Sequence, residues 1–273
     1  MAGQANDGEA IRDRLWVWAH EAGVYNGSWG LPDGSRITPV EGAYYLGIPN
    51  AIFVRYAGHP EPPFDRYALP FRSLRRVMWS IVGEAGRTSD AERELVLSLS
   101  RRLPNLTGFF MDDFFHLHPG RPWPEDGSVP AALSVEQLDR VRQQIRESGE
   151  RLELGVTLYT HQLDPRLRPH LERCDLISLW TWRAEELARL EESFRRYREI
   201  MPASRTLLGL YMWDFGTHRP MPLDAMRHQC EVGLRWLREG QVEGLIFLAT
   251  NLCDLELDAV EWTRGWIRNL SPH

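Results

Sequence analysis

The chain of 273 residues lacks the features that mark several protein classes. Its three cysteines form no spaced pair, so neither a disulfide framework nor a zinc cage is expected. No stretch approaches the ~18 consecutive apolar residues that span a bilayer, and the polar residues 1–10 show no signal-peptide pattern. These absences favour a cytoplasmic protein without a membrane partner.

Charge and motifs argue against two further classes. The formal net charge is −6 and there is no long basic run, so nucleic acid is not expected as a partner. The chain has neither a GxGxxG nor a GxxxxGK(S/T) motif, the glycine-rich patterns that hold nucleotide phosphates. Residues 214–216 spell the kinase DFG motif, but no kinase catalytic loop or glycine-rich loop accompanies them.

Strand-like and helix-like segments alternate along the whole chain. Candidate strands are residues 15–19, 51–57, 77–82, 106–111, 152–160, 175–182, 206–213 and 242–250. Candidate helices follow them, for example at residues 65–76, and several begin with a capping box such as Ser134 with Gln137.

Eight such units in a chain of this length predict a closed (β/α)8 TIM barrel, an α/β fold. We expect a single domain over residues 1–273, with residues 1–12 as a flexible or peripheral N-terminus. An open doubly wound sheet is the rival fold, but it usually has fewer strands and a phosphate-binding glycine motif after the first.

Two adjacent carboxylates, Asp112 and Asp113, stand at the end of the apolar run of residues 106–111. A run of this kind reads as a buried strand, and two carboxylates at its mouth are expensive to desolvate. The pair therefore predicts a polar site on top of the sheet.

In a barrel of this type, functional residues lie at the carboxyl ends of the strands. The candidate catalytic residues there are Glu84, Asp112, Asp113 and Asp214. The candidate substrate-binding residues are His20, Tyr56, Trp123, Tyr159, His161, Trp180, Trp182, Tyr211, Trp213 and Asn251. Trp123 belongs to the long loop of residues 116–133, a candidate binding wall or lid. Asp175 and Glu243 lie at strand starts, the end of a barrel that serves stability.

The favoured reaction is glycoside hydrolysis, which needs two carboxyl groups that flank the bond to be cleaved. Adjacent residues of a regular strand point to opposite sides, so Asp112 and Asp113 make a poor pair with each other. We therefore expect one of them to act with Asp214 across the mouth of the barrel. The other would bind sugar hydroxyls, and Glu84 is the reserve acid.

At these positions the chain resembles the (β/α)8 glycoside hydrolases, whose large clan carries carboxylates at the ends of strands four and seven. Asp112-Asp113 stands where that clan has Asn-Glu, and Asp214 stands where it has Glu. The run 112–115 also looks like the Asp-Asp-aromatic strand ends of α-galactosidase-type barrels, where both carboxylates grip sugar hydroxyls. The resemblance implies a sugar or oligosaccharide substrate.

Two other functions fit the same residues. A metal-dependent hydrolase or sugar isomerase would hold a divalent ion at Asp112 and Asp113, whereas the glycosidase reading expects no cofactor. Further ligands for such an ion would come from Glu84, His116, His118 and His161. A non-catalytic carbohydrate-binding barrel is the third possibility, because a fold alone does not prove activity.

Overall fold

The computed structural model describes residues 11–120, 122–149 and 151–270; most of the expected peripheral segment, residues 1–12, lies outside them. The barrel strands are β1 (Leu15–Ala19), β2 (Asn50–Phe53), β3 (Arg76–Val82), β4 (Leu106–Met111), β5 (Glu153–Tyr159), β6 (Leu176–Trp180), β7 (Thr206–Tyr211) and β10 (Gly244–Leu248). The α-helices are α2 (Pro39–Leu46), α3 (Asp90–Ser98), α4 (Val135–Glu147), α5 (Arg168–Leu171), α6 (Leu190–Ile200), α7 (Leu223–Arg238) and α8 (Asp258–Asn269).

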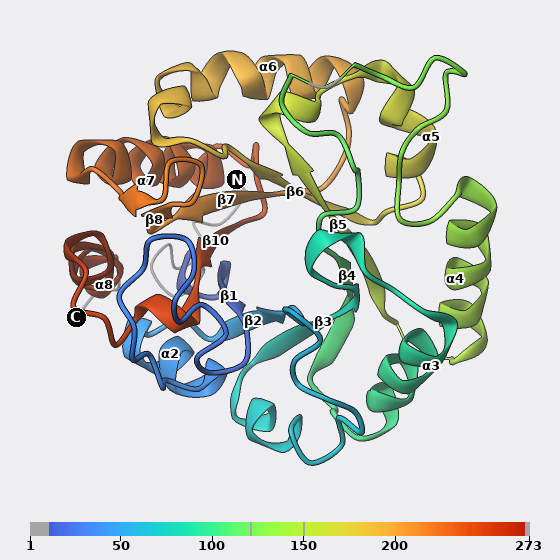
Figure 1. The fold of residues 1–273 in the computed structure, drawn as a ribbon, viewed down its shortest axis with the longest axis horizontal. Helices are drawn as coiled ribbons and strands as arrows, with labels where there is room; N and C mark the ends of the chain where they lie inside the picture. Colours follow the sequence, from blue (N-terminus) through green and yellow to red (C-terminus); the bar gives the residue numbers. More distant parts are fainter. Residues whose placement is uncertain (1–10, 121, 150, 271–273) are drawn as a thin grey trace, which may run out of the picture.

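The eight strands are parallel and close into a barrel in the order β1-β10-β7-β6-β5-β4-β3-β2. The helices surround this barrel (Figure 1). The (β/α)8 fold expected from the alternation of segments is therefore confirmed.

The second unit departs from the expected pattern. The helix expected at residues 65–76 is wrong: that stretch holds only a five-residue 3-10 helix, η1 (Leu69–Ser73). Aromatic rings fill the space beside the barrel instead, where Phe53 packs on Trp79 with ring centres 4.3 Å apart and Phe71 on Phe53 at 5.2 Å. Burial of large rings thus replaces the packing face of a helix.

Helix starts follow the capping signals of the sequence. Ser134 and Gln137 form the expected capping box at α4. At α3 only half of such a box forms: the Ser89 hydroxyl accepts from the Glu92 amide, but the Glu92 carboxylate pairs with Arg55 at 2.7 Å. The ion pair links α3 to the chain just beyond β2.

The barrel interior is packed with aromatic rings. The Trp18 ring meets Phe110 and Trp180 edge to face, with centres 5.4 and 5.3 Å away. Small residues make room for these rings, since a Cβ on Gly209 would lie 2.0 Å from the Trp180 indole and one on Gly155 would lie 2.6 Å from the Phe110 ring. Side chains therefore fill this barrel, as in other (β/α)8 folds.

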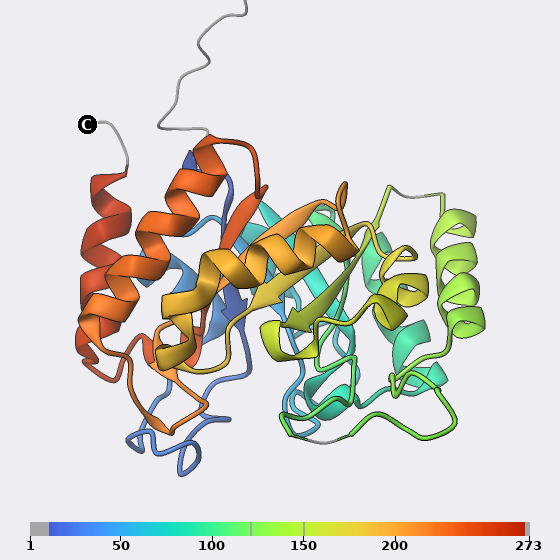
Figure 2. The ribbon, with the colours of Figure 1, turned by 90° about the horizontal axis from the view of Figure 1, so that it is seen from above.

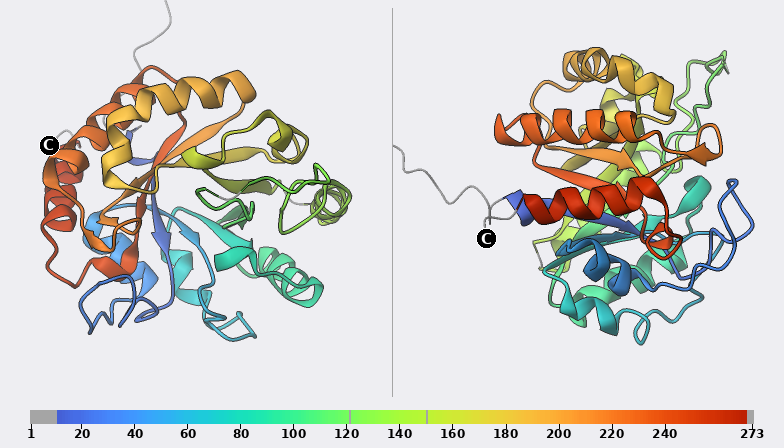
Figure 3. Two further views of the ribbon diagram at one scale, coloured as in Figure 1. Left: turned by 45° about the horizontal axis from the view of Figure 1, so that its top comes forward. Right: turned by 90° about the vertical axis from the view of Figure 1, so that its left-hand side faces the viewer.

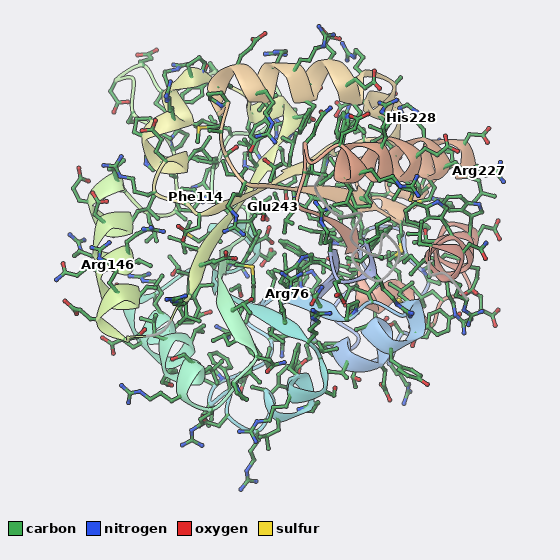
Figure 4. All side chains as sticks on the ribbon, turned by 180° about the vertical axis from the view of Figure 1, so that it is seen from behind. Arg76, Phe114, Arg146, Arg227, His228 and Glu243 are labelled. Atoms are coloured by element: carbon green, nitrogen blue, oxygen red, sulfur yellow. The ribbon has the colours of Figure 1, made fainter. Side chains whose placement is uncertain are left out.

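The amino ends of the strands carry an ion-pair network. The Arg205 guanidinium donates to both Glu243 carboxylate oxygens at 2.8 Å and also pairs with Glu153. The Arg76 guanidinium lies 4.7 Å from the centre of the Trp16 ring. Seen from behind, Arg76 and Glu243 lie near the middle of the barrel (Figure 4). Glu243 thus acts in holding the strands together.

The carboxyl ends of the strands carry the long loops. The loops after β1 and β4 lie on the same side of the molecule as the hairpin of β8 (Trp213–Asp214) and β9 (Arg219–Pro220). They share the lower edge of Figure 2 and the right-hand side of the second view in Figure 3. This end of the barrel is where a site is expected.

The packing at Gly209 gives a test of the barrel interior. Gly209→Ala places a methyl group inside the Trp180 ring, so we expect the free energy of unfolding to fall by about 1–3 kcal/mol. Gly265→Ala is the matched control, because Gly265 lies in α8 with nothing within 4 Å of an added Cβ; it should gain about 0.5–1 kcal/mol. Denaturant unfolding measures both, and equal effects would contradict the packing described.

Candidate active site

A cavity of about 460 Å³ opens at the carboxyl ends of the strands. Of the fourteen site residues predicted from the sequence, ten line it: His20, Tyr56, Glu84, Asp112, Asp113, Tyr159, His161, Trp180, Trp182 and Tyr211. The volume is within the usual range for small-molecule sites, and the largely aromatic wall with a few polar groups is also typical of them.

Asp112 and Asp113 both line this cavity, which the strand pattern alone does not predict. Strand β4 ends at Met111, and Asp113 has a φ of +43°, in the left-handed region. This turn breaks the alternation of a strand, so the expectation that the two carboxyl groups diverge is wrong. Left-handed backbone at a non-glycine residue is costly and is concentrated at functional sites.

The Asp112 carboxyl group is the more buried of the two, and only 7% of the residue is exposed. Burial raises its pKa well above the usual value, and the negative charge of Asp113 raises it further. One oxygen accepts a 3.3 Å hydrogen bond from the Thr157 hydroxyl. Asp112 therefore holds a proton at a pH where an exposed aspartate has lost it.

The Asp113 carboxylate is fixed by two donors. The Tyr159 hydroxyl donates to Oδ1 at 2.7 Å, and the Ala85 amide donates to Oδ2 at 2.9 Å. Ala85 belongs to the short 3-10 helix η2 (Glu84–Gly86) that follows β3. The ends of three neighbouring strands thus set the direction of this one carboxylate.

Phenol groups surround the pair. Burial raises the pKa of Tyr25, Tyr159 and Tyr211 well above the usual value, and the charge of Asp113 adds to the effect. The three hydroxyls therefore stay protonated and can donate hydrogen bonds. Tyr25 is absent from the sequence prediction because it lies in a loop rather than at a strand end.

His20 is a fully buried histidine of the cavity lining. Burial lowers its pKa to about 4, although the hydrogen bond with Val54 opposes the shift. The ring Nδ1 lies 2.7 Å from the Val54 carbonyl oxygen, which can only accept, so Nδ1 carries the hydrogen. Nε2 is then left as an acceptor.

Asp214 does not line the cavity, and the expected pair across the barrel mouth is corrected accordingly. Its carboxylate accepts from the Gly216 and Thr217 amides and, at 2.7 Å, from the Thr217 hydroxyl. These bonds close the hairpin of β8 and β9. Asp214 thus stabilises a turn, a role that aspartate has in many proteins.

Three further predicted residues also lie outside the cavity lining. The Trp213 indole donates to the Trp29 carbonyl at 3.0 Å, and the Asn251 amide donates to the Glu21 carbonyl at 2.7 Å. Both hold the loop that follows β1. Trp123 carries the Arg166 guanidinium 3.5 Å above its ring.

Besides Tyr25, sequence reasoning missed six aromatic or polar residues of the lining: Trp18, Trp29, Phe115, Thr157, Gln162 and Phe215. Trp18 and Thr157 lie inside strands, two residues before His20 and Tyr159, and share their face of the sheet. The alternation of side chains along a strand could therefore have predicted Trp18 and Thr157 as lining residues. Trp29 lies in the glycine-rich loop after β1, where no periodicity marks it.

Three histidines named as candidate metal ligands lie near the Asp pair. His116, His118 and His161 line the cavity, but no group of three or more His, Cys, Asp or Glu side chains among the described residues is arranged to hold a metal ion. The sequence also contains no lysine, so no imine with a lysine can form here. Carboxyl, phenol, imidazole, hydroxyl and amide groups line the cavity.

Together the fold and the cavity define a (β/α)8 barrel with an acidic, aromatic pocket at its carboxyl end. No family model matches the sequence, and no curated protein does. The fold is similar to the catalytic domain of a chitinase from Pyrococcus furiosus, with a TM-score of 0.60, 12% identity and coverage of 96% of this chain and 97% of that one.

Two other solved structures share the fold. Concanavalin B matches with a TM-score of 0.58, 10% identity and coverage of 95% of this chain and 99% of its own. A xylanase–amylase inhibitor protein matches with a TM-score of 0.58, 12% identity and coverage of 94% and 98%. Identities this low establish the architecture and no activity. None of the helices in the described part of the chain is long and apolar enough to cross a membrane.

Burial of Asp112 predicts a pH-dependent cost to stability. An unfolded aspartate ionises near pH ~3.9, whereas the raised pKa keeps Asp112 protonated in the folded state. Above that pH the folded state holds the extra proton, so its stability falls as the pH rises through this window. Asp112→Asn should lack this slope and gain in melting temperature over the wild type as the pH rises. Thr157→Val should keep the slope, and parallel curves for Asp112→Asn and the wild type would contradict the assignment.

His20 predicts a slope of opposite sign. Between pH ~6.5 and about 4 the unfolded chain binds a proton at His20 that the folded state does not, so stability falls as the pH falls. The loss is on the order of 3 kcal/mol across the window. His20→Asn keeps a donor for Val54 and should lose the slope. His228→Asn is the control that should keep it, because His228 lies on α7 with an exposed side chain (labelled in Figure 4). Urea unfolding at several pH values measures both.

Proposed function

We propose that this protein hydrolyses glycosidic bonds, with Asp112 and Asp113 as its two carboxyl groups. The observation that carries the proposal is their placement: both line one aromatic cavity, in different surroundings. Acid–base pairs in glycosidases are made in this way, by environments that hold one carboxyl group protonated and leave the other as a carboxylate.

Asp112 is the general acid in this proposal. It gives its proton to the oxygen of the leaving group as the bond to the anomeric carbon breaks. Asp113, directed by Tyr159 and the Ala85 amide, stabilises the positive charge that develops at that carbon. Water then adds to the carbon, and a proton returns to Asp112.

The sugar ring would rest on the half-buried tryptophans. Trp29 and Trp182 line the cavity and keep part of their surface exposed, whereas Trp18 and Trp180 are 2% and 1% exposed and form its floor. A carbohydrate ligand is also in keeping with the fold: a structure of a Pyrococcus furiosus chitinase domain with chito-oligosaccharides shares it, with a TM-score of 0.56 and 14% identity.

Conservative variants test the assignment. Asp112→Asn and Asp113→Asn should each lower turnover of an activated aryl glycoside by about 10²–10⁴-fold, because each removes a group that acts in the transition state. Asp214→Asn is the matched control, since Asp214 lies in the hairpin and should change turnover by less than about tenfold. Steady-state kinetics across a panel of aryl glycosides measures all three.

Full activity in Asp112→Asn would contradict the role of the acid. Sugar binding without turnover on any glycoside would instead identify a catalytically silent barrel, a possibility in keeping with a fold that an inhibitor protein shares.

A further inference from the structure

The described residues of the cavity lining include acidic side chains but no arginine. The acidic residues are Glu84, Asp112 and Asp113. Arg87 reaches the Glu84 carboxylate at 3.2 Å, but its own side chain is 67% exposed and stays outside. Among its described residues the cavity lining therefore offers no arginine to pair with a phosphate or carboxylate group of a ligand.

The electrostatic effect on the phenols points the same way. Burial raises the pKa of Tyr56, and the charges of Glu84 and Asp113 raise it further, whereas the Trp29 hydrogen bond and the Arg87 charge oppose the shift. The Asp113 charge acts on Tyr25 and Tyr211 with the same sign. The charges of Glu84 and Asp113 thus make the potential negative around these two residues, which favours a cation there.

The aromatic rings meet at right angles. The Trp182 ring is inclined by 81° to Trp29, by 83° to Tyr159 and by 86° to Tyr211, with centres 6.0, 5.7 and 5.8 Å away. Edge-to-face pairs are ordinary packing. Here the rings belong to the wall of a cavity, and walls of perpendicular rings form the cages that bind ammonium groups by cation–π attraction.

Acceptors complete this arrangement. The Asp113 carboxylate takes one hydrogen bond on each oxygen from the protein, and a carboxylate oxygen has room for another. His20 contributes Nε2, an acceptor because Nδ1 carries the hydrogen. An ammonium group has three donors and no acceptor, so it matches acceptors of this kind.

We infer that the ligand of this cavity is a sugar with a protonated amino group, an amino sugar whose amine is free. Its ammonium group lies beside the Asp113 carboxylate and against the faces of Trp182 and Trp29. The inference rests on the proposed function, which places a sugar ring in this cavity. It adds that the sugar has a protonated amino group.

Calorimetric titration of the full chain at about pH 6, where a primary amine is protonated, tests the inference with three probes. Glucosamine has the free amine, N-acetylglucosamine has the same nitrogen without charge, and glucose has a hydroxyl instead. Glucosamine should bind at least about tenfold more tightly than either neutral sugar, a difference within the range of a desolvated cation–π contact with an ion pair. Equal or weaker binding of glucosamine overturns the inference.

Variants separate the cage from general charge attraction. Asp113→Asn and Trp182→Leu should each bring the affinity for glucosamine down to that for glucose. Glu94→Gln is the charge-matched control on the exposed face of α3, outside the cavity lining, and should keep the preference. A preference that survives both Asp113→Asn and Trp182→Leu, or that Glu94→Gln abolishes, overturns the assignment to this cage.

The result is distinguishable from a failure of the proposed function. Hydrolysis of neutral glycosides without a preference for glucosamine would leave the glycosidase proposal intact and overturn this inference. Tight and selective glucosamine binding without turnover on glucosamine glycosides would support this inference and contradict the glycosidase proposal.

Discussion

The site depends on a single backbone turn at Asp113. If β4 continued in regular form, one of its two terminal carboxyl groups would face away from the barrel mouth. The left-handed φ of +43° directs both into one cavity. The Ala85 amide and the Tyr159 hydroxyl supply hydrogen bonds that hold the turned residue, so the ends of β3 and β5 support a conformation that is costly on its own.

Burial then gives the two carboxyl groups different properties. Asp112 has little exposed surface and a raised pKa, whereas Asp113 is half-buried and bonded on both oxygens. Keeping an ionisable group such as Asp112 away from water costs stability. At the far end of the barrel, Arg205 pairs with Glu243 and Glu153 and so connects the amino ends of β7, β10 and β5. The candidate site thus lies at one end of the barrel, and the ion pairs that connect strands lie at the other.

The sequence predicted the architecture well because hydrophobic runs and capping residues are local signals. All eight strands lie where those signals placed them, and the main failure was the helix at residues 65–76, which tertiary packing of aromatic rings replaced. Ten of fourteen site residues line the cavity since strand ends converge in any (β/α)8 barrel. The prediction for Asp214 was wrong for a different reason: aspartate is common both in hairpin turns and in catalytic sites, and the sequence does not separate the two. The turn at Asp113 could not be predicted from the local sequence, because residues at the ends of two other strands, Ala85 and Tyr159, hold it.

The charge of the inferred ligand bears directly on the acid. The Asp113 charge helps to keep Asp112 protonated while the cavity has no cation in it. An ammonium group beside Asp113 offsets that charge, so it lowers the pKa of Asp112 relative to the ligand-free cavity. By linkage, the substrate makes Asp112 a stronger acid at the moment when a proton must move to the leaving oxygen. A neutral sugar has no such effect, and Asp112 would then hold its proton as tightly as before. The amino group would therefore contribute to catalysis as well as to recognition, through the same carboxylate pair.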